Sequence, residues 1–234
     1  MAENQEVFTQ IYKNKKWGKD GAGSGRGSTI ENAQRTCEVI RQIFRSYKLH
    51  GLLDAPCGAL EWTEPFLLGM REEDPLFRYH GVDVVAHVVE QNRQRLLYDY
   101  CGFSTVDLAV QAPPSGFDLI LCRDALQHLS FRGIAGVLNS FARCDAPYLL
   151  VTSYKPAHSP WWRVHKRKDN RDIDTGGFFR NDLLSAPFSM SEGLLETFDD
   201  ARPTGLATGH LLLFYDLRSL SASRAFKSFI ERYR

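Results

Sequence analysis

The feature that most constrains the fold is a short apolar run that ends on a carboxylate and then turns at once. It reads Leu-Leu-Asp-Ala-Pro-Cys-Gly-Ala-Leu and occupies residues 52–60. A strand that ends on Asp54, turns through Pro56 and Gly58 and enters a helix-forming segment is typical of the first βα unit of a nucleotide-binding α/β domain. Pro56 and Leu60 stand where the outer glycines of a G-x-G-x-x-G loop would be, so the run alone does not identify a dinucleotide site.

Two later strand ends carry polar residues at the matching position. Residues 79–84 predict a second strand that ends on Asp83, whose two carboxylate oxygens suit the paired hydroxyls of a ribose. Residues 116–129 predict a buried strand that runs into Arg123, Asp124 and His128. Ligands bind outside the carboxyl ends of the strands in open α/β sheets, so the three strand ends predict one shared crevice.

With these motifs the sequence resembles the class I S-adenosylmethionine-dependent methyltransferases. The similarity runs through the loop 54–58, Gly81-Val-Asp83, Asp107 and residues 117–130, and it covers about residues 28–155. It is greatest to the subgroup whose first loop reads Asp-x-Pro-Cys-Gly and whose fourth strand runs into Arg-Asp-x-x-x-His. The resemblance implies a Rossmann-like, doubly wound α/β fold. This fold has a mostly parallel seven-stranded sheet with an antiparallel last strand, plus a lid insertion.

The resemblance also implies a cofactor and the residues that contact it. S-adenosyl-L-methionine would bind and S-adenosyl-L-homocysteine would leave, with Asp54 and Gly58 facing the methionine part, Asp83 the ribose and Asp107 the adenine amine. An equally good interpretation of Asp107 is a solvent-facing residue at a strand end. The cofactor-binding residues expected in this way are Trp17, Ser28, Asp54, Ala55, Pro56, Gly58, Asp83, Val84, Asp107, Leu108, Cys122 and Arg123.

His128 is the candidate catalytic base, with Asp124 as its partner. If this segment forms a helical turn, the two residues lie at i and i+4 on one face, where the carboxylate would orient the imidazole and raise its basicity. Such a pair suits proton abstraction from an acceptor hydroxyl. The alternative is that His128 packs beside the next helix while Asp124 pairs with Arg123. A Mg²⁺ site at Asp124, Asp172 and Asp174 is a weaker alternative; nothing in the spacing demands a metal, and we expect none.

The chain is expected to divide into a leader and one domain. Residues 1–27 are polar and then glycine-rich, which is typical of a flexible segment. In the resembling subgroup a Trp and a Ser/Gly-rich segment precede the first helix, which implies a cover over the cofactor with Trp17 and residues 24–28 near it. The methyltransferase domain would span residues 28–234, and residues 155–190 break its rhythm as a probable substrate lid. The substrate residues expected there are Trp161, Asn170, Asp172, Thr175 and Gly176.

Periodicity and turn residues predict the other elements. Ser28 and Glu31 have capping-box spacing, which predicts a helix from about residue 29. Alternating strand and helix patterns favour a parallel sheet with right-handed crossovers. The further expected elements are helices from Thr63, over 85–96, 134–141 and 226–233, and strands at 105–108, 148–153, 194–198 and 210–216.

Composition restricts partners and compartment. Lys and Arg (29) nearly balance Asp and Glu (28), so no global field draws the chain onto nucleic acid or an anionic membrane. The five cysteines have no metal-ligand spacing and are typical of reduced thiols in a reducing compartment. Without an apolar leader or membrane-spanning run, the sequence predicts a cytoplasmic protein with no membrane contact.

The leading functional hypothesis is an S-adenosylmethionine-dependent O-methyltransferase that acts on a hydroxyl of a small acceptor, with a sugar or glycan preferred. The sugar preference rests on the polar lid, its tryptophans and the resemblance to methyltransferase modules beside glycan-building enzymes. Alternatives are an N- or O-methyltransferase of another small metabolite or of nucleic acid, and a non-catalytic cofactor-binding scaffold. Nucleic acid is disfavoured because the fourth strand is followed by Cys122-Arg-Asp-Ala rather than Asn/Asp-Pro-Pro-aromatic. The oligomeric state is not predicted.

Overall fold

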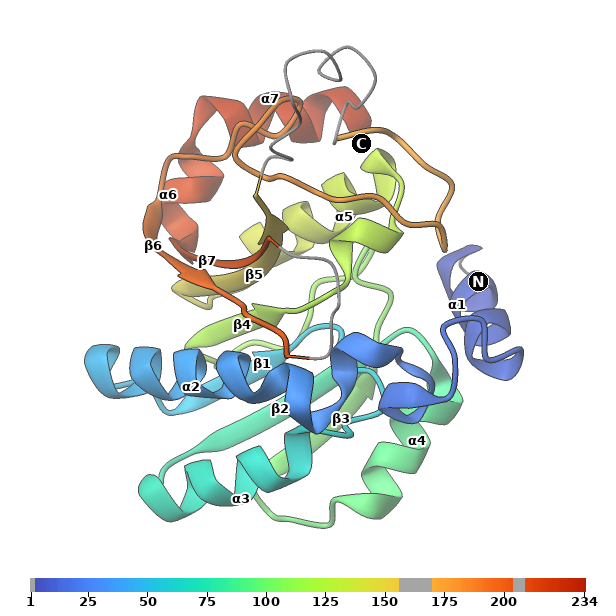
Figure 1. Cartoon of the computed structure of the whole chain (residues 1–234). Coiled ribbons are helices and arrows are strands. Elements are labelled where there is room, and N and C mark those ends of the chain that lie inside the picture. The colour runs from blue at the N-terminus through green and yellow to red at the C-terminus, as the bar shows by residue number, and fades with distance from the viewer. Residues whose placement is uncertain (1–2, 156–169, 204–208) are drawn as a thin grey trace.

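The computed structural model describes residues 3–155, 170–203 and 209–234 of the chain, which forms a seven-stranded sheet flanked by helices (Figure 1). The strand order is β3-β2-β1-β4-β5-β7-β6. The first five strands pair in parallel, whereas β7 is antiparallel to both of its neighbours. This confirms the predicted Rossmann-like sheet with an antiparallel last strand. The strands are β1 (Gly51–Asp54), β2 (Arg78–Asp83), β3 (Cys101–Thr105), β4 (Leu119–Cys122), β5 (Tyr148–Tyr154), β6 (Leu194–Asp199) and β7 (His210–Asp216).

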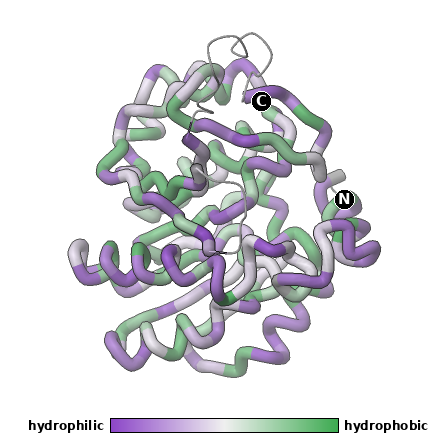
Figure 2. The backbone as a smooth tube through the Cα atoms, in the orientation of Figure 1, coloured by the Kyte–Doolittle hydropathy of each residue, from purple (hydrophilic) through white to green (hydrophobic). Residues whose placement is uncertain are grey.

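Helices cover both faces of the sheet, and the buried apolar side chains form one cluster on each face. Figure 2 shows the hydropathy of the residues along these strands and helices. Successive strand residues point to opposite faces, so Leu52 and Leu53 of β1 join different clusters of buried side chains. One face packs against α2 (Ile30–Tyr47), α3 (Thr63–Glu73) and α4 (Ala86–Arg95). The other packs against α5 (Phe131–Ala142), α6 (Leu217–Ala222) and α7 (Arg224–Tyr233).

The change of face places a crevice at the middle of the sheet. The crossovers that leave β1 and β2 run through α3 and α4 on one face, whereas the crossover that leaves β4 runs through α5 on the other. Strands β1 and β4 are paired neighbours. The chain therefore diverges at their carboxyl ends, which is the topological switch point where open α/β sheets bind ligands.

The N-terminal segment is more ordered than its composition predicts. A helix, α1 (Glu3–Lys13), is followed by two short 3₁₀ turns at Asp20–Gly23 and Arg26–Ser28. Ile11 of α1 is buried. A Cβ atom at Gly176 would lie 2.8 Å from a methyl of Val7 and 3.0 Å from one of Ile11, so the helix packs closely on that glycine. The expectation of a flexible leader is therefore replaced by a helix that packs on the domain.

The structure corrects the predicted start of one helix and the predicted position of one strand, and it adds one helix. Helix α2 is capped by Thr29, whose side chain accepts a hydrogen bond from the Asn32 amide, and not by Ser28. Strand β3 ends at Thr105, where the sequence suggested that a strand begins, because the preceding residues pair with β2; Asp107 therefore lies in the loop after the strand. The closing helix is preceded by α6, which the sequence analysis did not anticipate.

The expected lid at residues 155–190 is only partly described, because residues 156–169 lie outside the described part of the chain. Residues 170–190 run without regular secondary structure, yet they pack into the core through Phe179, Leu183, Phe188 and Met190. Burial of these apolar side chains makes this part of the segment an integral layer over α5 rather than a separate cover. No helix among the described residues is long and apolar enough to cross a membrane.

Candidate functional site

A cavity opens at the carboxyl ends of the central strands and extends under α1. Its carboxylates come from the ends of β1, β2 and β4, and most of its apolar lining comes from the loop after β3, from residues 125–129 and from α1. Among the residues expected from the sequence, the cavity is lined by Trp17, Ser28, Asp54, Pro56, Gly58, Asp83, Val84, Leu108, Arg123, Asp124 and His128. Ala55 and Cys122 are instead fully buried in the core beneath it.

Two buried carboxylates hold the first loop against the neighbouring strand. Asp54 accepts a hydrogen bond from the hydroxyl of Tyr79 at 3.0 Å, and burial raises its pKa to about 7 against the opposing effects of Tyr79 and Arg123. Asp83 accepts from the amides of Gly58 (3.0 Å) and Val85 (2.9 Å). Burial raises the pKa of Asp83, while these amides act to lower it. Each Asp83 oxygen accepts one amide and retains capacity for a ribose hydroxyl.

The N-terminal segment docks onto the first loop at Gly58. This glycine is left-handed, with φ 57°, and a Cβ atom there would lie 2.8 Å from Ser24 Oγ and 3.3 Å from the Tyr12 hydroxyl. Ser24 Oγ accepts from the Ala59 amide at 3.0 Å and is paired with the Tyr12 hydroxyl at 2.7 Å. Gly58 is therefore required both by its backbone conformation and by the approach of these two hydroxyls.

Aromatic side chains of the N-terminal segment form one wall of the cavity. Phe8, Tyr12 and Trp17 all line it, and the rings of Phe8 and Tyr12 lie 5.9 and 6.2 Å from that of Trp17. The Trp17 ring lies 4.7 Å from the imidazole of His128, which belongs to the short 3₁₀ turn after β4. Residues 3–28 thus supply a substantial part of the site.

The loop after β3 supplies the apolar end of the cavity. Val106, Leu108 and Ala109 line it, whereas Asp107 is not among the described lining residues. Asp107 Oδ1 accepts hydrogen bonds from the Asn4 side chain and the Ala109 amide, both at 3.0 Å. Asp107 Oδ2 is buried without a hydrogen-bond partner among the described residues. A buried acceptor without a donor is costly, and an amino group placed there would satisfy it.

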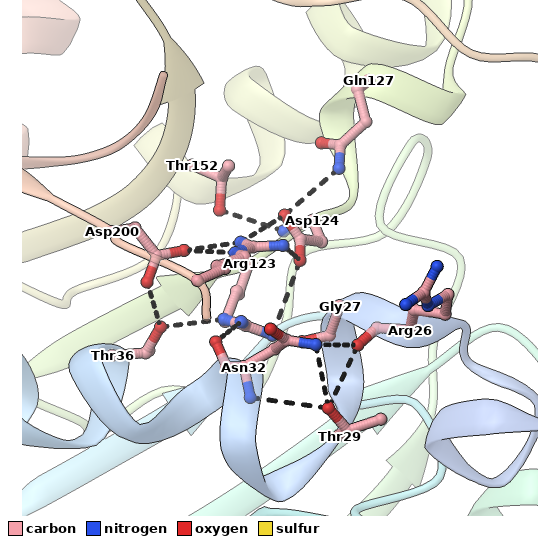
Figure 3. Close-up of polar contacts among 11 residues, drawn as sticks. Arg26, Gly27, Thr29, Asn32, Thr36, Arg123, Asp124, Gln127, Thr152 and Asp200 are labelled. Carbon is pink, nitrogen blue, oxygen red and sulfur yellow. Dashed lines mark hydrogen bonds and ion pairs between the residues drawn. The ribbon is translucent and has the colours of Figure 1, made fainter. Parts of the chain in front are cut away.

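A charged network stands behind the end of β4 (Figure 3). Arg123 donates to Thr36 Oγ1 (2.9 Å) and to the carbonyl oxygens of Gly27 (2.9 Å) and Asn32 (3.1 Å), so it ties the strand end to the start of α2. Thr36 in turn donates to the buried Asp200. Through Arg123, the strand end positions the backbone of the N-terminal segment beside the cavity.

Arg202 completes this network and explains the state of Asp124. Its guanidinium donates to both oxygens of Asp124, at 2.7 and 3.0 Å, and to Asp200 at 2.9 Å. Burial alone would raise the pKa of Asp124, but Arg202 and Arg123 outweigh it and hold that pKa well below its usual range. Asp124 is therefore a charged anchor for two arginines.

The expected Asp124–His128 pair is corrected by this geometry. Asp124 has φ 52° and precedes a short 3₁₀ turn at Leu126–His128, so the two residues do not stand one above the other on an α-helical turn. His128 Nδ1 lies 2.8 Å from the carbonyl oxygen of Gly177. The group that orients the imidazole is a backbone carbonyl, and Asp124 acts on it only as a nearby charge.

This contact determines which nitrogen of His128 can accept a proton. A carbonyl oxygen only accepts, so Nδ1 carries the hydrogen and Nε2 carries the lone pair. Burial lowers the pKa of His128, while the Gly177 carbonyl and Asp124 act to raise it. The lowered pKa favours the neutral ring, which is the form of a general base.

The described residues among those expected to contact substrate make contacts within the protein. Asp172 accepts from the first amide of α5, at Phe131, and Thr175 accepts from the Ser130 amide beside it. Asn170 donates to three carbonyl oxygens of residues 182–186. Gly176 packs under α1, and Trp161 lies outside the described residues. Their polar groups are used to hold residues 170–190 in place.

Several lining residues were not expected from the sequence. Phe8 and Tyr12 have helical spacing, but the polar composition of the N-terminal segment around them predicts a flexible leader. Arg202, which holds Asp124 but does not itself line the cavity, stands alone in a loop far along the chain, so no local pattern marks it. Other unanticipated lining residues are Asn4, Cys57, Trp62, Val106, Ala109, Ala125, Leu126, Leu129 and Val137. Within the described residues no group of three His, Cys, Asp or Glu side chains suits a metal ion.

No family model and no curated protein matches the sequence. Solved structures do match the fold. The magnesium protoporphyrin IX methyltransferase ChlM from Synechocystis PCC 6803, with bound S-adenosylmethionine, has a TM-score of 0.59 at 14% identity and covers 92% of this chain and 97% of its own. The N-methyltransferase NodS from Bradyrhizobium japonicum WM9, in complex with S-adenosyl-L-homocysteine, has a TM-score of 0.60 at 14% identity and covers 88% and 97%.

A third structure, of TnmH, has a TM-score of 0.55 at 16% identity and covers 79% of this chain, which spans 56% of that protein. Identities this low carry no information on substrate. The structural matches themselves show that the chain has the fold of class I S-adenosylmethionine-dependent methyltransferases.

Proposed function

We propose that the chain is an S-adenosylmethionine-dependent O-methyltransferase that transfers a methyl group to a hydroxyl of a small acceptor, with a sugar or glycan as the preferred class. The observation that carries the proposal is the orientation of His128. Its Nδ1–H is directed at the Gly177 carbonyl, which leaves Nε2 as a proton acceptor on a residue that lines the cavity. A neutral imidazole there suits the deprotonation of an alcohol.

The residues around the cavity fit the proposed cofactor. Asp83 is a buried carboxylate at the end of β2 and can accept both ribose hydroxyls. Asp107 lies in the loop after β3, and its Oδ2, buried without a donor among the described residues, matches the exocyclic amine of an adenine ring. The aromatic wall of α1 and Trp17 would cover the bound molecule. When bound, the cofactor supplies the reactive methyl group and its leaving group.

The protein's own contribution is then positioning and proton transfer. The acceptor hydroxyl must lie in line with the bond to the departing sulfur, and the cavity walls restrict its approach. His128 Nε2 takes the hydroxyl proton as the new carbon–oxygen bond forms, and the Gly177 carbonyl stabilises the resulting imidazolium through Nδ1. Asp124 adds a nearby negative charge that favours the same imidazolium.

N-methylation and a non-catalytic scaffold are the competing proposals. NodS, which shares the fold, is described as an N-methyltransferase. An amine that is already neutral has no need of a base at the moment of transfer, so its methylation would depend little on His128. A scaffold would bind the cofactor without turnover.

The cytoplasmic location expected from the sequence is retained as part of the proposal.

Calorimetric titration with S-adenosylmethionine, followed by an acceptor screen that uses a methyl-labelled cofactor, separates the three. We expect cofactor binding and label transfer to a hydroxyl compound, with transfer abolished in His128→Ala. Label transfer to amines alone would support N-methylation. Cofactor binding without transfer would support the scaffold, and failure to bind the cofactor would refute all three.

A further inference from the structure

We infer that the acceptor is a neutral or anionic hydroxylated ring, held by one flat face against Phe178 and Trp17, whose rings both lie next to that of His128. The inference rests on the proposed function, because it names the substrate class of that same site. Phe178 is a specificity-determining residue in this arrangement. Neither ring was assigned to an acceptor by the sequence analysis.

A continuous row of rings extends from the cavity; beyond the cavity Phe178 is exposed, whereas Tyr154 and His210 are buried. The His128 imidazole lies 4.7 Å from the Trp17 ring and 5.7 Å from the Phe178 ring. Phe178 continues to Tyr154 at 6.3 Å, and Tyr154 to His210 at 4.5 Å. Trp17 and His128 line the cavity, so the row is an extension of the site and not a separate cluster. Rings at these separations form the tilted and edge contacts that aromatic groups prefer.

Phe178 is exposed in a place where burial was available. It is 48% exposed, whereas its neighbour Phe179 is 2% exposed and packs in the core. A large apolar ring left in water beside a functional cavity is typical of a binding surface when the ring itself is well supported. Phe178 has that support from the rings of His128 and Tyr154 beneath it.

The backbone on both sides of Phe178 is anchored, so the ring is preorganised. The Gly177 amide donates to the Asp174 carbonyl at 3.0 Å, and the Gly177 carbonyl accepts from His128. The Phe179 amide donates to the Gln127 carbonyl at 3.1 Å. Binding on such a surface loses little conformational entropy. The same Gly177 that orients the candidate base therefore also positions the ring next to it.

The charges around the row decide the sign of the acceptor. The Lys16 ammonium donates to the Gly176 carbonyl at 3.1 Å, and it acts to lower the pKa of His128. The Arg180 guanidinium lies over the Tyr154 ring, 5.2 Å from its centroid. Asp124 and Asp200 also act on these rings, but Arg123 and Arg202 balance them. With Lys16 and Arg180 the net charge around the row is positive, which disfavours a cationic acceptor and accommodates a neutral or anionic one. A sugar ring with its C–H face and an aromatic ring both meet the stacking requirement.

The test is saturation-transfer NMR on the protein loaded with S-adenosyl-L-homocysteine. Three probes are compared: methyl glucopyranoside as a cyclic sugar, catechol as an aromatic ring, and sorbitol as an open-chain polyol. The variants are Phe178→Ala, Phe178→Tyr as the conservative replacement, and Leu184→Ala as a matched control, because Leu184 is 37% exposed in the same segment. Tight binding of S-adenosyl-L-homocysteine by every variant shows that the fold and the cofactor site are intact.

We expect a ring probe to bind and sorbitol to give no signal. Phe178→Ala should weaken ring binding about tenfold, while Phe178→Tyr and Leu184→Ala should stay within about twofold of the parent. Binding of the glycoside alone identifies a sugar face, and binding of catechol alone identifies an aromatic acceptor. The inference is overturned if no ring probe binds, if sorbitol binds equally well, or if Phe178→Ala leaves ring binding unchanged. Failure to bind S-adenosyl-L-homocysteine would instead refute the proposed function.

Discussion

Replacing Asp124 by asparagine should destabilise the protein without removing the base. Asp124 and Asp200 face Arg123 and Arg202, so the cluster holds two positive and two negative charges. The side chains of Arg202 and Asp200 are 3% and 0% exposed, and that of Asp124 is 16% exposed. An asparagine has the same shape but leaves the cluster with one excess positive charge out of contact with bulk water.

The size of the expected loss of stability depends on the contact that Arg202 keeps with Asp200. Removing one partner from a buried ion pair costs 3–5 kcal/mol in general, and the remaining contact with Asp200 places this case near the lower end, at about 3 kcal/mol. For a chain of this length that loss corresponds to a fall in Tm of about 6–12 °C. Differential scanning calorimetry measures it directly.

The matched control is Asp199→Asn. Asp199 is 67% exposed and pairs with Lys155 at the surface, so its replacement should change the free energy of unfolding by less than about 1 kcal/mol. The pH dependence supplies a second check. The folded-state pKa of Asp124 is depressed below the ordinary value of 3.8, so its contribution is complete above that value and is lost as the pH falls below it. The Asp124→Asn difference should therefore be equal at pH 5 and pH 7. A Tm shift no larger than that of the control would refute the network.

Three further predictions concern activity and binding. His128→Ala should lower kcat by ~10²–10⁴-fold while the Kd for S-adenosyl-L-homocysteine stays within about twofold. Parent activity should rise with pH and have its midpoint below the ordinary histidine value of 6.5, because burial lowers the pKa of His128; a flat profile or near-parental kcat would exclude the base. Asp83→Ala should weaken S-adenosyl-L-homocysteine binding at least tenfold by calorimetry, since a charge-assisted contact contributes roughly 1.5–3 kcal/mol, and an unchanged Kd would remove it from the site. Gly136→Ala should lower both Tm and the affinity for S-adenosyl-L-homocysteine, because the added Cβ would overlap the Ala109 carbonyl behind the cavity. In the control Gly133→Ala the added Cβ would lie 3.2 Å from its nearest atom, so Tm and affinity should change little; equal losses in the two variants would contradict this packing.

The sheet was predictable because its signals are local. The apolar runs that became β1, β4, β5 and β7 need only their own residues to be recognised, and the polar residues that end them identify the crevice. Helix α1 was missed because a short helix gains its stability from packing, and its partner Gly176 lies far along the chain.

The sequence identified several side chains of the candidate site but not the contacts that they make. The sequence placed His128 and Asp124 together but paired them through a helical turn that the left-handed backbone at Asp124 does not form. The true partners are a backbone carbonyl at Gly177 and the guanidinium of Arg202. A carbonyl carries no sequence signal, and an arginine 78 residues away has no spacing that would reveal it. Long-range polar contacts are the part of a site that pattern reading does not reach.

The hydrogen bonds of the first loop are the reason why we expect binding to depend on the N-terminal segment. In glycine-rich loops the free amides approach the ligand, but here three consecutive amides are already used. Those of Cys57, Gly58 and Ala59 donate to Val82, Asp83 and Ser24 respectively. A loop whose amides are engaged at these positions cannot donate hydrogen bonds from them to a bound molecule. The polar hydroxyl of Ser24 and the aromatic wall of α1 stand where such contacts would be, so we expect the cofactor's methionine end to depend on residues 3–28 rather than on the outer glycines that this sequence lacks.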